Sequence, residues 1–570
     1  MKETLETIIL KALGELGVQA ESVVLEHPAD LAHGDYSTSA ALAYAKAAQK
    51  APRALAEEIV SAISANMPKE IAGIEIAGPG FINFKLSKEF FATVTDTITT
   101  NPEAWGTTTL LSGKKVMVEY TQPNPFKPFH IGHLMSNAIG ESLSRIVEAC
   151  GAKTVRANYQ GDVGPHVAKA IWMMRKKGIA EAQTLPANLA AGWIGTCYSE
   201  ASTLYEDDPA IKAEIDAVNK QVYDRSNPEV NDLYDWGRKV SLEAFEGIYA
   251  TLGTRFDHYF FESDMAPIGK EIVLANIGKV FDESNGAIVF QAQNYNPKLH
   301  TRVFINSQGL PTYETKEIGL TLTKFEKENP DISIVDTAIE QGEYMKVVQK
   351  AISLMYPEYE SRMKHVTHGM MRFASGKMSS RKGNVITGES LITDAKEIVF
   401  EKMAERDFTA QEREEIATAV GVSAVKYSIL RQATGGDILF DFEKSISFEG
   451  DSGPYLQYTA IRANAVLQKG ITEGISPSSI VPDVWQETNL EKYLYRFEEV
   501  IAHAYAELQP HYITTYLTEL ASYFNTFYSS GKIVDSTDPA SAYRLALTQA
   551  FYFTMKRGLY LLGIALPVKM

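Results

Sequence analysis

Two histidines three residues apart, His130 and His133, stand in a stretch whose residue types suit the binding of phosphate groups. Residues 115–121 before them have the composition of a β-strand, and a proline-rich turn leads from that strand to His130. Two imidazoles on the first turn of a helix can donate to phosphate oxygens, and the helix dipole adds positive potential there. Gly132 leaves room for a nucleotide to approach the backbone. We call residues 130–133 the histidine motif, and we expect it to hold a nucleoside triphosphate.

A second stretch with phosphate-binding composition lies far downstream, at residues 376–384, and we call it the lysine motif. Between its flanking glycines it has three cations, two hydroxyls and a methionine: Lys377, Met378, Ser379, Ser380, Arg381 and Lys382. This composition suits a loop that closes over phosphates. Composition alone favours a basic surface turn equally well.

The elements that must position these motifs follow from periodicity and turn residues. Residues 115–159 are predicted to form a β-α-β unit, with strands at 115–121 and 154–159 and a helix that ends near Gly151. Such a unit begins a parallel sheet. It lacks the Gly-x-Gly-x-x-Gly sequence, so no dinucleotide fingerprint is present. Further strand patterns occur at 287–290, 302–305, 332–335 and 365–368.

Changes in pattern along the chain predict several modules. Residues 1–110 have short helices beside short strands, which is typical of a small α+β domain. Residues 111–395 are predicted to form a Rossmann-like parallel-sheet domain, with a mostly helical insertion at about 179–262. Residues 396–444 are predicted to be a helical connector. Residues 445–570 repeat apolar side chains at three- and four-residue steps, which predicts an α-helical bundle.

Composition excludes several protein classes. Apolar residues make up 45% of the 570 residues and charged residues 22%, as in soluble globular proteins. No apolar run of about 18 residues is present, so we expect no membrane contact. Cys150 and Cys197 lack the spacing of a disulfide framework or a zinc site. The N-terminus does not resemble a signal peptide. We therefore expect a cytoplasmic protein without a metal site of its own.

Net charge alone argues against a nucleic-acid partner, because the formal charge is −16 at pH 7. Binding to phosphates depends on local fields rather than on the total charge, however. Basic residues do gather locally, at 175–177 and between 362 and 382. The charge therefore leaves a nucleic-acid partner open.

The two motifs are similar to the His-Ile-Gly-His and Lys-Met-Ser-Lys-Ser signatures of class I aminoacyl-tRNA synthetases. The first match is complete, whereas Ser380 stands where the second signature has its second lysine. Over nearly its whole length the chain resembles the arginyl-tRNA synthetases within that class. In chain order, the matching stretches are residues 33–37, 78–83, 119–133, 158–164 and 451–458, with Arg462 and residues 561–564 after them.

The resemblance implies a two-step reaction. L-Arginine and ATP give arginyl-adenylate and pyrophosphate, and the arginyl group then passes to the 3′-terminal adenosine of tRNA-Arg. The implied fold is a Rossmann-like catalytic domain between an N-terminal domain that binds the tRNA elbow and a C-terminal bundle that binds the anticodon. Mg²⁺ is expected to accompany ATP, and a monomer is expected.

The resemblance also implies roles for individual residues. The phosphates of ATP and the departing pyrophosphate would be stabilised by His130, His133, Lys377, Arg381 and Lys382. The rest of the ATP site would be Gly132, Met378, Ser379 and Ser380. Arginine would be bound by Glu119, Asn124, His133, Tyr313, Glu317 and Gln341, and Glu317 stands where aspartate is more usual in the family. The anticodon would be contacted by Tyr455, Tyr458 and Arg462.

Three alternatives remain from the sequence. The first is a class I synthetase for another amino acid, such as cysteine or glutamate, although the absence of zinc-type Cys/His sets argues against cysteine. The second is a tRNA-independent nucleotidyltransferase or amino-acid ligase, in which the terminal modules would have no use. The third is a non-catalytic tRNA-binding paralogue, against which the intact His130, His133 and Lys377 argue.

Overall fold

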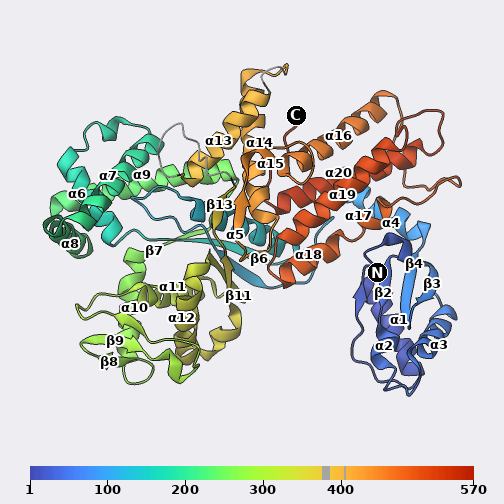
Figure 1. Ribbon diagram of the computed structural model, residues 1–570, viewed down its shortest axis with the longest axis horizontal. Coiled ribbons are helices and arrows are strands. Elements are labelled where there is room, and N and C mark those ends of the chain that lie inside the picture. Colours follow the sequence, from blue (N-terminus) through green and yellow to red (C-terminus); the bar gives the residue numbers. More distant parts are fainter. Residues whose placement is uncertain (375–385, 404–405) are drawn as a thin grey trace. The chain divides into compact units, whose positions relative to one another are not determined.

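The computed structural model describes residues 1–374, 386–403 and 406–570, and Figure 1 shows its elements. The chain forms two compact units, each built from separate stretches of sequence. The first unit comprises Met1–Trp105, Thr459–Glu498 and Thr518–Lys556. The second comprises Gly106–Tyr458, Glu499–Leu517 and Arg557–Met570.

The N-terminal part of the first unit is a small α+β fold, as predicted. Its antiparallel sheet has the order β1-β2-β4-β3, with β1 at Leu25–Glu26, β2 at Tyr36–Thr38, β3 at Ile71–Ala77 and β4 at Phe81–Leu86. The helices are α1 (Lys2–Glu15), α2 (Ala40–Tyr44), α3 (Pro52–Ser64) and α4 (Lys88–Thr100). Leu5, Ile59 and Phe84 are fully buried between these elements. Pro52 opens α3, where its missing N–H is not needed.

The C-terminal residues are helical, as the apolar periodicity predicts. The helices are α16 (Gly453–Thr472), α17 (Glu491–Leu494), α18 (Phe497–Ala506), α19 (His511–Ser529) and α20 (Ser541–Leu561). In the first unit, Phe524 of α19 stacks on Phe551 of α20 with ring centroids 3.9 Å apart. Such aromatic pairs stabilise a helical core beyond the area they bury.

The second unit contains the predicted parallel sheet, in the order β12-β11-β5-β6-β7. The strands are β5 (Lys115–Glu119), β6 (Lys153–Gln160), β7 (His258–Phe261), β11 (Ile332–Ala338) and β12 (Met363–His368). The chain runs from β5 through β6 to β7 and then returns to β11 on the other side of β5. This reversal makes a topological switch point between β5 and β11, and ligands of open α/β sheets bind at the carboxyl ends of the strands there.

Helices follow the strands of this sheet. Between β5 and β6 lies α5 (Ile131–Ala149), and between β6 and β7 lie α6 (Pro165–Lys177), α7 (Ala187–Asp207), α8 (Pro209–Asp224) and α9 (Pro228–Leu252). Later helices are α10 (Glu262–Ala275), α11 (Tyr313–Glu328), α12 (Gly342–Met355), α13 (Gly388–Lys402), α14 (Ala410–Leu430) and α15 (Phe442–Ser445). None of the helices in the described part of the chain is long and apolar enough to cross a bilayer.

Three details of the sheet prediction need correction. The insertion predicted at about 179–262 contains β7, which pairs with β6 in the parallel sheet. The predicted strands at 287–290 and 302–305 exist, but they lie in a separate antiparallel sheet of β8 (Asp282–Ser284), β9 (Ala287–Phe290) and β10 (Arg302–Ile305). This sheet buries Phe290 and Phe304 in its own cluster with Phe281. The first predicted strand, 115–121, ends at Glu119, because the backbone turns away at Thr121. A two-stranded parallel pair, β13 (Met371–Phe373) and β14 (Ile438–Phe440), was not predicted.

Candidate functional site

The turn from β5 to α5 is strained and is fixed by side chains of α5. Thr121, Gln122 and Phe126 have φ values of 77°, 50° and 68°. For β-branched Thr121 this is a rare conformation, and each such residue costs about 1–3 kcal/mol. The amide of Thr121 donates to Ser136 Oγ at 2.9 Å, and Asn137 Nδ2 donates to Thr121 Oγ1 at 3.0 Å. The bonds to α5 hold the turn in its strained form.

The two histidines of the histidine motif lie where the sequence predicts, at the start of a helix. His130 is the N-cap of α5, and its backbone N–H donates to His133 Nδ1 at 3.3 Å. The two rings are stacked with centroids 3.4 Å apart. His130 is exposed, whereas His133 is only 6% exposed. A Cβ on Gly132 would lie 3.1 Å from the His130 ring, so glycine gives the rings and a ligand space.

Both imidazoles are neutral near pH 7. Desolvation of the protein-facing side of the ring, and then the charge of Lys127, lower the pKa of His130 to about 4 although the residue is exposed. Burial, followed by His130 and Lys127, lowers the pKa of His133 well below its usual value. Neutral rings act on a phosphate as hydrogen-bond donors, and the helix N-terminus and Lys127 supply the positive potential.

The segment after the lysine motif is joined to the histidine motif. The amide of Gly388 donates to the carbonyl of Phe129 at 2.8 Å, and Thr387 forms an isolated antiparallel bridge with His130. A Cβ on Gly388 would lie 2.9 Å from the Phe129 ring and 3.1 Å from the His130 carbonyl oxygen. Residues 387 and 388 therefore lie directly against the first histidine. The predicted residues Lys377, Met378, Ser379, Ser380, Arg381 and Lys382 lie outside the described residues.

Two predicted arginine-binding carboxylates lie together below the carboxyl edge of the sheet. Glu119 is 1% exposed, and its Oε2 pairs with Lys324 Nζ at 2.6 Å. Gln122 Nε2 donates to the other oxygen of Glu119 at 2.9 Å. Glu317 is 5% exposed, and its Oε1 has no hydrogen-bond partner in the described part of the protein. Burial, and then the charge of Glu119, raise the pKa of Glu317.

The other predicted arginine-binding residues lie at the edge of the same region. Asn124 Oδ1 lies so close to Gly161 that a Cβ on Gly161 would overlap with this oxygen. The same Cβ would lie 3.2 Å from Glu262 Oε1. Tyr313, the first residue of α11, is 64% exposed. Gln341 follows the carboxyl end of β11 and is exposed. The structure thus places two carboxylates inside, with Tyr313 and Gln341 on the surface.

Sequence reasoning missed several charged residues of this region. Lys324 is the partner of Glu119, and its spacing of seven residues from Glu317 on one helix is the signal that could have found it. Lys316 Nζ pairs with Glu262 Oε2 at 2.6 Å, with both side chains nearly buried. Its Nζ also lies 5.1 Å from the ring centroid of Tyr313. An ion pair of this kind is not visible in the sequence, because its members are 54 residues apart.

Asp162, inside the stretch 158–164 that resembles the family, fixes the loop after β6 through hydrogen bonds. It is fully buried and accepts hydrogen bonds from the amide and hydroxyl of Ser263 at 2.9 and 2.8 Å. It also accepts from Tyr234 and from Arg238 Nε at 3.0 and 2.9 Å. These bonds tie the loop after β6 to α9 and α10, close to Gly161 and Asn124.

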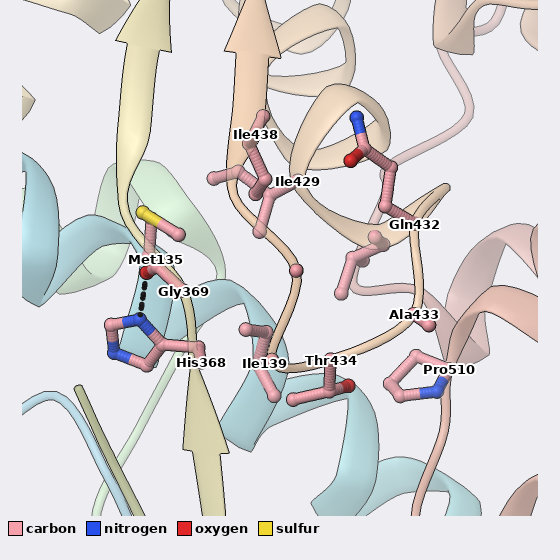
Figure 2. A pocket seen from close by; sticks show the side chains of 13 residues that line it. Met135, Ile139, His368, Gly369, Ile429, Gln432, Ala433, Thr434, Ile438 and Pro510 are labelled. Carbon is pink, nitrogen blue, oxygen red and sulfur yellow. Dashed lines mark hydrogen bonds between the residues drawn. The ribbon is translucent and has the colours of Figure 1, made fainter. Parts of the chain in front are cut away.

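A small cavity of about 10 Å³ lies behind the first turns of α5, as Figure 2 shows. Met135 and Ile139 of α5 line it, together with His368 and Gly369 and the turn around Thr434. His368 Nδ1 is hydrogen-bonded to the carbonyl of Gly369 at 2.9 Å. A cavity of this size holds about one water. This cavity is too small to hold a nucleotide.

The three predicted anticodon-binding residues lie on α16. Tyr455 and Tyr458 are half-buried, and the Tyr458 ring lies 6.4 Å from that of Phe448. Arg462 Nη1 donates to Asn525 Oδ1 at 2.9 Å. These contacts show that the side chains of Tyr458 and Arg462 take part in packing.

Comparisons with known proteins match this arrangement. Residues 97–442 match the model of the class I (R) tRNA synthetase catalytic domain. Residues 456–570 match the DALR anticodon binding domain, and residues 3–86 match the arginyl tRNA synthetase N-terminal domain.

Relatives and solved structures match the chain along its length. The arginine–tRNA ligase of Limosilactobacillus reuteri (strain DSM 20016) is 31% identical over 572 residues, covering 100% of both chains. That of Clostridium acetobutylicum is 31% identical over 96% of both. The Thermus thermophilus arginyl-tRNA synthetase structure covers 100% of both chains, with a TM-score of 0.82 and 24% identity. The Plasmodium falciparum arginyl-tRNA synthetase has a TM-score of 0.79 and 20% identity, covering 100% of this chain and 99% of its own.

Proposed function

The chain belongs to the class I arginyl-tRNA synthetase family, and we propose that it activates L-arginine with ATP and transfers the arginyl group to the 3′-terminal adenosine of tRNA-Arg. The observation that supports arginine is the open carboxylate of Glu317 beside the Glu119–Lys324 pair. A guanidinium pairs with a carboxylate through two parallel hydrogen bonds. Because Lys324 pairs with Glu119, ionisation of Glu317 gives the site one net negative charge, which suits one guanidinium.

In the activation step, a carboxylate oxygen of arginine attacks the α-phosphorus of ATP. An acyl-phosphate bond forms, and the bond from the α-phosphorus to the bridging oxygen breaks, so that pyrophosphate leaves with the electron pair. Such a step depends on alignment and on stabilisation of phosphate charge. We assign that stabilisation to His130 and His133, with Gly132 giving space for the nucleotide.

The lysine motif is assigned to the departing pyrophosphate. Lys377 with Arg381 or Lys382 would neutralise its charge, and the ATP site would be completed by Met378, Ser379 and Ser380. The backbone bridge between Thr387 and His130 supports this assignment, because it returns the chain from the lysine motif to the phosphate end of α5. Loss of one such donor typically lowers the rate about 10²–10³-fold.

The arginine side chain is assigned to the two buried carboxylates, Glu119 and Glu317. Tyr313 and Gln341 would close the site from the surface, and Asn124 with His133 would hold the backbone groups of the amino acid. A buried polar site of this kind can reject an analogue without the right donors by about 10⁴–10⁵-fold. Such selectivity needs no separate editing domain.

Mg²⁺ would enter with ATP, since this ion keeps several waters and is usually shared with substrate phosphates. In the three described ranges of the chain, no group of three or more His, Cys, Asp or Glu side chains is arranged to hold a metal ion. We therefore assign the binding of Mg²⁺ to the triphosphate oxygens of ATP, together with water.

The modules are assigned to different parts of the tRNA. Residues 1–110 would bind the elbow, residues 111–395 with the insertion at 179–262 would catalyse, 396–444 would connect, and 445–570 would bind the anticodon. The matches to an N-terminal domain and an anticodon-binding domain support this division. We propose that the enzyme acts as a monomer in the cytoplasm.

Within the helical region, Tyr455 and Tyr458 are the candidates for stacking on unpaired anticodon bases, with Arg462 beside them on α16. Stacking of a base on an aromatic ring contributes about 1–3 kcal/mol. Half-buried rings can still offer an edge or a face to RNA. Replacement by leucine would separate packing from stacking, because leucine fills space but has no ring on which a base can stack. Such variants would keep ATP–pyrophosphate exchange at saturating tRNA while the KM for tRNA rises.

Aminoacylation of total tRNA with each of the twenty amino acids tests the function. We expect charging with arginine alone, and we expect ATP–pyrophosphate exchange to require tRNA, as the family implies. Charging with a different amino acid would support the first alternative. Exchange without any tRNA charging would support a tRNA-independent ligase. The absence of both reactions would support a non-catalytic paralogue.

A further inference from the structure

Lys324 gives the arginine site a counter-charge of its own. Its ammonium lies 2.6 Å from Glu119 Oε2, and both side chains are only 1% exposed. Because Gln122 Nε2 donates to Glu119 Oε1, both oxygens of this carboxylate already have a partner. Glu317, two helical turns before Lys324 on α11, is different, since its Oε1 has no partner in the described ranges. We call Glu119, Glu317 and Lys324 the buried trio.

Two other carboxylates near the buried trio have cations of their own. Glu262 forms its own ion pair with Lys316, and Glu314 pairs with Arg302 at 3.3 Å. Neither pair therefore changes the net charge that the trio presents. When its members are ionised, the trio has one uncompensated negative charge. Burial of such a charge is costly unless a cation and hydrogen bonds compensate it.

The cavity behind the trio, which the exposed Lys364 also lines, is too small to admit the guanidinium of arginine. Glu317 and Lys324 line a cavity of about 10 Å³ together with Val335 and Met345. This volume holds about one water and is too small for a guanidinium. The compensating cation must therefore arrive from the carboxyl edge of the sheet, on the side of Asn124.

We propose that Lys324 is a charge-compensating residue of the arginine site, which neutralises Glu119 so that the trio presents one open carboxylate to one singly charged side chain. The inference rests on the arginine binding proposed above. Lys324 does not touch the substrate and acts through Glu119, so it is a positioning residue. Because the charge of Lys324 neutralises Glu119, the site accepts one further cation.

This role predicts an unusual rescue between two substitutions. Glu317→Gln leaves Glu119 and Lys324 paired, so an incoming guanidinium brings an uncompensated positive charge into the site. Lys324→Met in the same chain removes that lysine charge and frees Glu119, and the site again has one open carboxylate. A residue that only packs the core would make the double variant worse than Glu317→Gln.

The experiment compares the full-length parent, Glu317→Gln and Glu317→Gln/Lys324→Met in arginylation of tRNA. We expect the KM for arginine to rise about 100-fold in Glu317→Gln and to recover about tenfold or more in the double variant. The KM for ATP should stay within about twofold in all three, because the ATP site is unchanged. Thermal unfolding of each variant measures folding separately. Should the methionine variant fail to fold, Glu317→Gln/Lys324→Gln is used instead, because glutamine is also uncharged and keeps a hydrogen-bond donor for Glu119.

The matched control is Glu317→Gln/Lys114→Met. Lys114 pairs with Asp331 at 3.2 Å, its side chain is 55% exposed, and it lies just before the opposite end of β5. This change removes the same charge and should leave the arginine KM of Glu317→Gln unaltered. No recovery in either Lys324 double variant, or equal recovery in the Lys114 control, would overturn the role of Lys324 while leaving the proposed function intact. A parent enzyme that fails to charge tRNA with arginine would instead overturn the proposed function, and this inference with it.

Discussion

The amide of Gly388 donates to the carbonyl oxygen of Phe129 at 2.8 Å, one residue before the first histidine. This bond joins the start of α13, which follows the lysine motif, to the N-terminus of α5. The two motifs are more than 240 residues apart in sequence. The contact between the start of α13 and the start of α5 depends on a position where no side chain fits, because a Cβ on Gly388 would press on Phe129 and on the His130 carbonyl.

Gly388→Ala should therefore lower catalysis without weakening arginine binding. The new methyl group would displace α13 from His130, and small misplacements of reacting groups can cost about 10²-fold in rate. We expect kcat for arginylation to fall about 10- to 100-fold, with the KM for arginine nearly unchanged. Gly247→Ala is the control, since its Cβ would have no neighbour within 4 Å. An unchanged kcat in Gly388→Ala would show that the junction has no part in catalysis.

Ser136→Ala should release the strained turn at Thr121. The hydroxyl of Ser136 accepts from the amide of Thr121 at 2.9 Å, and its loss leaves a buried donor unpaired. Such a loss costs about 1–3 kcal/mol, which urea unfolding would measure. Because the turn sets the direction of Glu119 and Gln122, the KM for arginine should also rise. Ser144→Ala, whose hydroxyl donates to Gly140 O in the same helix, should affect stability less and leave the KM unchanged.

Local sequence signals predicted much of the fold for physical reasons. The β-α-β unit, the helix start at His130 and the helical C-terminal region depend on periodicity and turn residues, which are local properties. The sheet that contains 287–290 and 302–305 was not distinguished from the parallel sheet. Pairing between strands is non-local, and short apolar runs do not reveal their partners.

Site residues could be predicted where they match positions of the family's motifs. Contacts between residues far apart in sequence could not be predicted. Glu119 and Glu317 were expected, and they do lie together. The pairing of Lys324 with Glu119 joins residues 205 apart, and the one local signal is the seven-residue spacing that puts Lys324 on the same face of α11 as Glu317. The end of β5 at Glu119 also escaped prediction, because the positive φ of Thr121 is imposed by Ser136 rather than by its own preference.

Glu317→Gln should weaken arginine binding far more than ATP binding. The amide keeps the shape of the side chain but removes the open negative charge, and loss of one member of a buried charged pair costs about 2–5 kcal/mol. We expect a large rise in the KM for arginine and a change of less than about twofold in the KM for ATP. Glu326→Gln, on the exposed side of α11, is the matched control. Equal effects on both substrates would remove Glu317 from the arginine site.

The fold should lose stability as pH falls below neutrality, and His166 should contribute to that loss. Burial, followed by the charge of Lys127, lowers the pKa of His166 to about 3, and its Nε2 lies 2.9 Å from the carbonyl oxygen of Gly161. An unfolded histidine has a pKa of about 6.5, so below that pH the unfolded chain takes up a proton that the folded chain does not. The stabilisation is complete above pH 6.5 and is lost as pH falls from 6.5 towards 3.

His166→Gln should remove this part of the pH dependence. Glutamine can still donate to the Gly161 carbonyl, but it does not titrate, so the free energy of unfolding should fall less between pH 6.5 and pH 5. The difference from the parent should be roughly 1 kcal/mol per pH unit, because one pKa unit corresponds to about 1.4 kcal/mol and His166 is partly exposed. Urea unfolding at several pH values measures it, with the exposed His300→Gln as a control. Identical slopes for the parent and His166→Gln would mean that another histidine, such as His133, accounts for the acid sensitivity.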